Sequence, residues 1–107
     1  MFPRRTKLRI IGLSYNKIST LPSDIFSDMP FLEQVFLAGN MMAVLPEETF
    51  QPVMSQLKIL TVRGNPIKCD CSIAWVLQER VVKGNCYAPK AIRDKPFSQL
   101  TRRDIRC

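Results

Sequence analysis

The sequence of 107 residues has no histidine, only four glycines and no cysteine before Cys69. Without histidine it lacks the usual imidazole base of enzymes, and no glycine-rich phosphate-binding loop occurs. It contains no Asn-x-Ser/Thr glycosylation site, and no apolar run approaches the ~18 to 20 residues that a membrane helix needs. We therefore predict a chain that is not an enzyme, binds no cofactor and has no membrane span.

Negative charge is also scarce, since 16 Lys and Arg residues outnumber nine Asp and Glu residues and give a formal charge of +7. A nucleic-acid binder of this size would need a basic face interleaved with aromatic residues, or a known binding motif. Neither is found, because the basic residues are spread from Arg4 to Arg106. We predict no nucleic-acid partner, and the apolar content of 46% is that of one globular domain.

The sequence repeats itself with a period of 24 to 25 residues. Four columns recur three times: Leu8, Leu32 and Leu57; Ile11, Val35 and Leu60; Leu13, Leu37 and Val62; Asn16, Asn40 and Asn65. Three further matches recur twice: Ile18 with Met42, Leu21-Pro22 with Leu45-Pro46, and Phe26 with Phe50. The alternation in each copy predicts a short strand with its column residues, such as Leu8, Ile11 and Leu13, pointing inward.

The copy from Leu32 to Phe50 reads Leu-x-x-Val-x-Leu-x-x-Asn-x-Met-x-x-Leu-Pro-x-x-x-Phe, which resembles a leucine-rich repeat of the extracellular type. The resemblance covers Leu8 to Ile67 and implies an α/β solenoid, whose short parallel strands form a concave sheet. It also implies that Asn16, Asn40 and Asn65 turn inward and bond backbone groups of adjoining turns. Phe26 and Phe50 would fill the back of the core.

The repeats divide the first part of the chain into residues 8–31, 32–56 and a partial copy at 57–67. Phe2 precedes Leu8 by six residues, as Phe26 precedes Leu32, so we interpret residues 1–7 as the remnant of an earlier repeat. On that interpretation Met1 is a truncation point, and the open edge of the first strand favours self-association. The alternative is that Phe2 is a chance aromatic residue.

Four cysteines lie within the last 39 positions and predict a disulfide-stapled unit in an oxidising compartment. A zinc site is the alternative, but Cys-x-Cys followed by 14 and then 20 residues is not the spacing of structural zinc sites. Spacing alone leaves three disulfide pairings open.

From Asn65 the sequence Asn-Pro-Ile-Lys-Cys-Asp-Cys-Ser-Ile-Ala-Trp-Val-Leu is similar to the start of the cysteine-rich carboxy-terminal cap of leucine-rich repeat proteins. This resemblance assigns residues 65–107 to a capping module and implies the pairs Cys69–Cys86 and Cys71–Cys107. Asp94 stands where that family commonly has a glycine. Residues 72–83 predict a helix, capped by Asp70 or Ser72, that covers the last repeat and buries Trp75.

Two surfaces are candidates for a partner. The first is the concave face of the predicted sheet, where outward positions carry Ile10, Tyr15, Gln34, Phe36, Ile59, Thr61 and Arg63. Aromatic and Arg side chains dominate protein interfaces, although scattered exposed apolar residues are ordinary. The second is a basic patch on the cap: Lys90, Arg93, Lys95, Arg102, Arg103 and Arg106.

We accordingly predict a protein-recognition module of a secreted or cell-surface protein, which binds a protein ligand or receptor through the concave face. Binding of a sulfated glycan or another anionic surface through the basic patch is the alternative. A non-catalytic subunit that binds an enzyme has the same sequence features.

Overall fold

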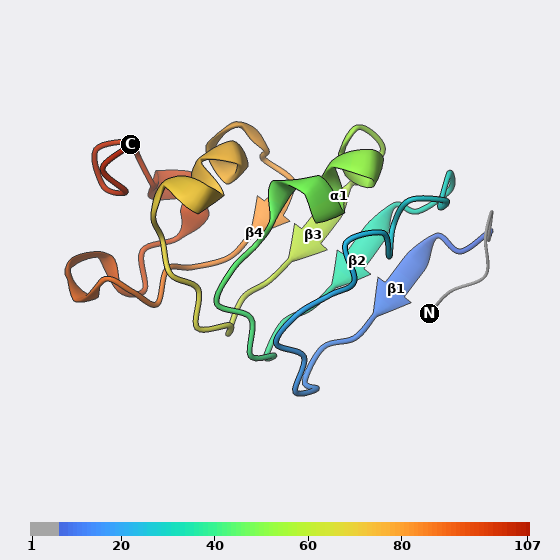
Figure 1. The fold of residues 1–107 in the computed structure, drawn as a ribbon, viewed down its shortest axis with the longest axis horizontal. Helices are drawn as coiled ribbons and strands as arrows, with labels where there is room; N and C mark the ends of the chain where they lie inside the picture. Colours follow the sequence, from blue (N-terminus) through green and yellow to red (C-terminus); the bar gives the residue numbers. More distant parts are fainter. Residues whose placement is uncertain (1–6) are drawn as a thin grey trace.

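The computed structural model describes residues 7–107, which form a stack of turns with all strands in one parallel sheet (Figure 1). The strands follow chain order across the sheet: β1 Ile10–Gly12, β2 Gln34–Phe36, β3 Ile59–Thr61 and β4 Val82–Lys83. The helices are α1 Glu47–Met54 and three 3-10 helices, η1 Cys71–Gln78, η2 Lys90–Ile92 and η3 Phe97–Gln99. The predicted remnant of an earlier repeat, including Phe2, lies outside the described residues except for Lys7.

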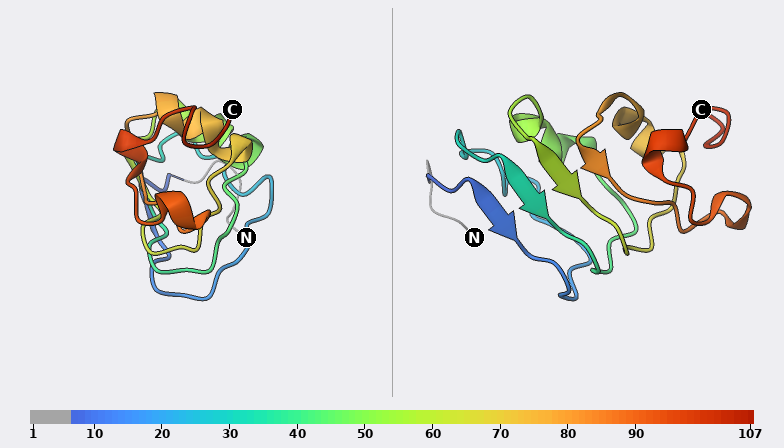
Figure 2. Two further views of the ribbon diagram at one scale, coloured as in Figure 1. Left: turned by 90° about the vertical axis from the view of Figure 1, so that its left-hand side faces the viewer. Right: turned by 180° about the vertical axis from the view of Figure 1, so that it is seen from behind.

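The register of the sheet follows the period of the sequence. Ile11 pairs with Val35, Val35 with Leu60 and Leu60 with Val82, and all four side chains are buried. Because side chains alternate between the two faces of a strand, the residues on either side of this row point to solvent. Seen from behind, the four strands lie side by side on the near side of the molecule, with α1 on the far side (Figure 2). The predicted solenoid with parallel strands is confirmed.

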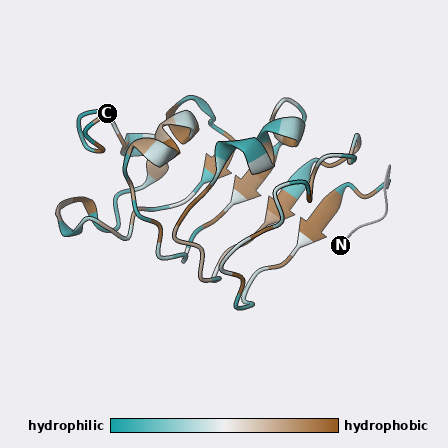
Figure 3. Cartoon of the chain, in the orientation of Figure 1, coloured by the Kyte–Doolittle hydropathy of each residue, from teal (hydrophilic) through white to brown (hydrophobic). Residues whose placement is uncertain are grey.

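Aromatic rings fill the core behind the sheet. Phe26 and Phe50 are fully buried with ring centroids 5.6 Å apart, and Trp75 of η1 stacks on Phe50 at 5.9 Å. The Trp75 indole N–H donates to the Leu45 carbonyl at 3.0 Å, so its polar atom is satisfied where the ring is partly buried. Figure 3 colours β1 and β3 as hydrophobic and much of α1 as hydrophilic.

Asparagine side chains link each turn to the one before it. The Asn40 Oδ1 accepts from the backbone N–H groups of Asn16 and Ile18, and its Nδ2 donates to the Leu13 and Leu37 carbonyls. Asn65 likewise connects Met42, Leu37 and Val62. Both side chains are buried, whereas the Asn16 side chain is exposed and, among residues 7–107, donates within its own turn, to Leu13 and Ser14.

Two predictions about local structure are wrong. Leu8 is 37% exposed rather than inside the core, because it precedes β1 at the outer edge of the described sheet. The helix expected over 72–83 ends at Gln78. Val82 and Lys83 instead form β4, since Leu60 N–H donates to Val81 O and Val62 N–H to Lys83 O. Of the two candidate caps, Asp70 accepts the Ser72 backbone N–H at 2.9 Å.

The repeat pattern of the sequence does not predict helix α1. It buries Thr49, Phe50 and Val53 against the back of the core and contains Pro52. A proline in a helix interior normally disfavours the helix, so burial of this short apolar stripe decides its conformation. No helix within residues 7–107 is both long and apolar enough to cross a membrane.

Candidate functional site

The solvent side of the sheet brings the predicted concave-face residues into two rows. Ile10, Gln34 and Ile59 occupy one row, and Gly12, Phe36, Thr61 and Lys83 occupy the next. Ile10 is 54% exposed, whereas Gln34, Phe36, Ile59 and Thr61 are partly covered by their neighbours. We call these two rows, with Tyr15 and Arg63 at their edge, the concave face.

Tyr15 and Arg63 flank the turn that follows β2. The Tyr15 N–H donates to the Ala38 carbonyl at 2.7 Å, and the Gly39 N–H donates to the Arg63 carbonyl at 2.8 Å. The Tyr15 side chain is 84% exposed. A Cβ added at Gly39 would lie 2.5 Å from Tyr15 Cδ1, so the tyrosine ring lies directly over the Gly39 backbone.

Charge on this side of the sheet is mainly positive. Glu33 lies between Arg9 and Lys58, with N–O distances of 3.2 and 3.5 Å. Its hydrogen bond from the Arg9 guanidinium is the main cause that lowers the pKa of the Glu33 carboxyl. Arg63 and Lys83 are exposed and have no carboxylate partner within residues 7–107. Sequence reasoning assigned Lys83 to the cap helix; the pairing of β3 with β4 places it on the concave face.

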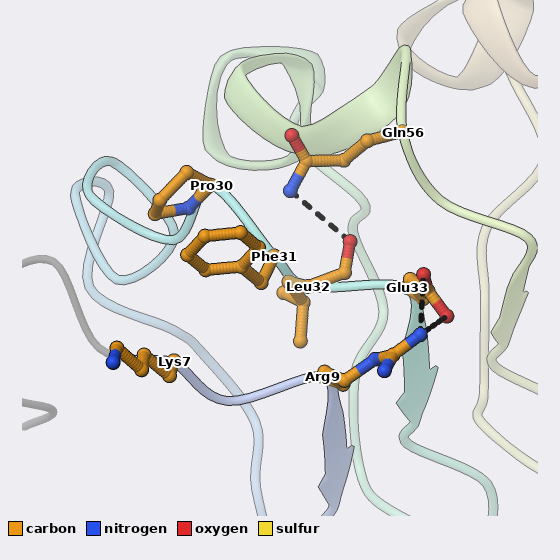
Figure 4. A pocket seen from close by; sticks show the side chains of 7 residues that line it. All are labelled: Lys7, Arg9, Pro30, Phe31, Leu32, Glu33 and Gln56. Atoms are coloured by element: carbon orange, nitrogen blue, oxygen red, sulfur yellow. Dashed lines mark hydrogen bonds and ion pairs between the residues drawn. The ribbon is translucent and has the colours of Figure 1, made fainter.

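An open cavity of about 430 Å³ lies where the chain enters β1 and β2 (Figure 4). It is lined by Lys7, Arg9, Pro30, Phe31, Leu32, Glu33 and Gln56. The Gln56 amide donates to the Met29 and Leu32 carbonyls, and Arg9 is held by Glu33. These polar groups therefore connect neighbouring turns, and we assign the cavity no ligand.

Two disulfides lie within the cap. The structure joins Cys69 to Cys86 and Cys71 to Cys107, with Cα atoms 5.6 and 5.3 Å apart. This is the pairing that the family resemblance implies, and it leaves no free thiolate for the alternative zinc site. Asp94 adopts a φ of 69°, in the left-handed region that glycine enters most readily, which agrees with the glycine that the family resemblance implies at this position.

The basic patch is divided between two loops of the cap. Arg93 lies 4.6 Å from the centre of the Tyr87 ring, near Lys90 of η2. Arg102, Arg103 and Arg106 are exposed in the last turns of the chain. Lys95 is instead bound to Asp104 at 2.8 Å, and this bond is the main cause that lowers the pKa of the Asp104 carboxyl.

The family model for the leucine rich repeat matches residues 6–67, which is more than half of the chain. This chain is a leucine-rich repeat protein. The match covers the stacked turns from before β1 to the residues that lead into the cap. The asparagine bonds between turns and the buried leucine columns are thus those of a leucine-rich repeat solenoid.

Similar proteins extend the likeness through the cap. Peroxidasin homolog pxn-2 of Caenorhabditis elegans is 28% identical over 109 residues, which cover 91% of this chain and 8% of that protein. The crystal structure of human 5T4, or trophoblast glycoprotein, superposes with a TM-score of 0.76 at 26% identity over 94% of this chain. A chain in the octameric complex of Latrophilin 3, Unc5D and FLRT2 gives 0.72 at 27% identity over 92%. This leucine-rich repeat chain spans 39% and 32% of those two solved chains.

Proposed function

We propose that this chain is a protein-recognition module of a secreted or cell-surface leucine-rich repeat protein, and that it binds a protein ligand or receptor through the concave face. The observation that carries the proposal is the row of bulky side chains held toward solvent by the sheet. Phe36 lies between the β1 and β3 strands, and Ile10 and Ile59 occupy the row beside it. The strands fix the backbone that carries these side chains, so little backbone entropy is lost on binding.

Two further observations support the proposal. One solved relative belongs to an octameric complex in which the leucine-rich repeat of FLRT2 is assembled with Latrophilin 3 and Unc5D. Two disulfides within 107 residues indicate folding in an oxidising compartment, as for secreted proteins and ectodomains. The module acts by recognition rather than by catalysis.

The test is binding of the purified chain to an array of secreted and cell-surface ectodomains, followed by affinity measurements on any protein that binds. Phe36→Ala should weaken binding by about 2 kcal/mol, which is typical of a buried aromatic anchor. Met41→Ala is the matched control, because Met41 is an exposed apolar residue that lies outside the concave face. Unchanged affinity for Phe36→Ala, Tyr15→Ala and Arg63→Ala would exclude the concave face.

A second candidate function is binding of a sulfated glycan through the basic patch. It is favoured by Arg102, Arg103 and Arg106, which are exposed near the end of the chain and have no carboxylate partner within residues 7–107. The protein should be retained on heparin at low salt, elute at modest salt because such contacts are screened, and elute earlier after Arg102→Ala with Arg103→Ala. Flow-through at low salt would exclude this function.

A further inference from the structure

At two positions of the first repeat, the residue type differs from the one that the local backbone favours. At position 12, inside β1, a Cβ would meet no atom of the described residues within 4 Å, so a side chain fits there. The positions that align with it carry Phe36 and Thr61. A glycine in a strand weakens it, because it contributes no packing and loses more conformational freedom on folding. Stability therefore does not explain Gly12.

Tyr15 is a bulky residue at a position whose backbone conformation favours glycine. Its φ is 60°, in the left-handed region, and the equivalent positions of the next two turns are Gly39 and Gly64, with φ values of 68° and 77°. The turn suits glycine, and a bulky residue in that conformation is strained. Tyr15 is also 84% exposed, so little burial of its ring offsets the strain.

Both exceptions lie on the concave face, close to one set of small side chains. In the register of the sheet, Gly12 is beside Phe36 and Ser14 is beside Ala38. The Ser14 hydroxyl accepts the Ala38 N–H at 3.2 Å, and the Tyr15 ring lies over Gly39 next to them. Small residues at 12, 14 and 38 are thus flanked by Ile10 and Phe36 on one side and by Tyr15 on the other. We call this surface the Gly12 platform.

The charges beside the platform indicate the chemistry of its partner. Arg63 follows β3 next to Ala38 of the platform, and Lys83 lies farther along the row of Gly12 and Phe36, beyond Thr61. Both are exposed, and the one carboxylate on this side of the described sheet, Glu33, is already held by Arg9 and Lys58. An acidic segment therefore complements this side of the sheet.

From these observations we infer that the Gly12 platform accepts one bulky apolar side chain of a protein partner, whose acidic residues face Arg63 next to the platform and Lys83 farther along the same row. Gly12 leaves the space for that side chain against Phe36, and Tyr15 closes the other side. The inference rests on the proposed function and specifies which part of the concave face selects the partner.

The probe is a phage-displayed library of random 12-residue peptides selected on the immobilised 107-residue chain. Enriched peptides should share an aromatic or large aliphatic residue accompanied by Asp or Glu. Gly12→Thr fills the platform with the residue type found at position 61, and Tyr15→Gly gives the turn its preferred residue. Each should weaken an enriched peptide by about tenfold while the Tm stays the same or rises. Val44→Thr, on an exposed residue outside the concave face, should change neither.

The outcomes separate this inference from the proposed function. Peptides that bind Gly12→Thr and Tyr15→Gly as tightly as the unmodified chain, but lose affinity for Phe36→Ala, would overturn the inference and leave the proposed function standing. Enriched peptides that are unaffected by Phe36→Ala would count against both. A selection that enriches no peptide, or only basic peptides, would also overturn the inference.

Discussion

Replacement of Asn65 by alanine should show how strongly one side chain holds two turns together. Its Oδ1 accepts the Met42 N–H at 3.0 Å, and its Nδ2 donates to the Leu37 and Val62 carbonyls at 2.9 and 2.8 Å. The residue is only 5% exposed, so water does not replace these bonds freely. Three bonds at about 1 kcal/mol each give an expected loss of about 3 kcal/mol.

The matched control is Asn16→Ala, which removes the same residue type from the same position of another turn. The Asn16 side chain is exposed, and its bonds within residues 7–107 go to its own turn, to the Leu13 and Ser14 carbonyls. Its loss should cost about 1 kcal/mol or less, because water can hydrate the freed groups. The difference between the two variants therefore isolates the contribution of burial and of the bonds between turns.

The assay is urea denaturation followed by circular dichroism with both disulfides intact. Asn65→Ala should lower the free energy of unfolding by about 3 kcal/mol, a large part of the ~5 to 15 kcal/mol typical of such a domain. Asn65→Asp should be at least as destabilising at neutral pH, because a carboxylate oxygen would face two carbonyl oxygens. Equal losses for Asn65→Ala and Asn16→Ala would refute the role assigned to the buried asparagine.

Three more predictions concern the cap. Gly84→Ala should cost about 1 to 3 kcal/mol of stability, measured by thermal unfolding, since a Cβ there would lie 2.7 Å from a Phe97 ring atom; an unchanged Tm would contradict the packing. Loss of the Cys71–Cys107 disulfide, which closes a loop of 36 residues, should cost about 4 kcal/mol in urea under non-reducing conditions; an unchanged midpoint would show that the bridge does not constrain the unfolded chain. The lowered pKa of Asp104 means that its contribution is present above the ordinary pKa of aspartate and is lost as pH falls through the folded pKa. Asp104→Asn should therefore lower stability at pH 7 and make it depend less on pH in the acid range, and an identical pH profile would refute this.

The stacked strands can be predicted from the sequence, because every repeat must place a buried apolar residue at the same position. Val35 and Leu60 occupy one column and lie in register in the sheet, both fully buried. The outward positions follow from the same alternation, so Phe36 and Ile59 face solvent as part of a candidate site. Whether those residues bind a partner stays a prediction.

Segments that do not follow the repeat of 24 to 25 residues are harder to predict from the sequence. Val82 and Lys83 continue a pattern that favours a helix, yet they form a strand because the edge of β3 offers unpaired backbone groups to them. Residues 47–54 contain Pro52, which argues against a helix. They nevertheless form α1, because the helix buries Phe50 in the core. In both cases contacts with distant residues outweigh local preference.

The sequence by itself determined that the chain is built from stacked turns, with asparagine and leucine columns at fixed intervals and a cysteine-rich end. These features follow from the spacing of residues along the chain, which the sequence alone gives. Only the tertiary structure decided that Lys83 lies on the concave face, that Gly12 has open space above it, and that Tyr15 occupies a glycine conformation. The physical reason is that space, strain and neighbouring charge depend on which turns lie against one another.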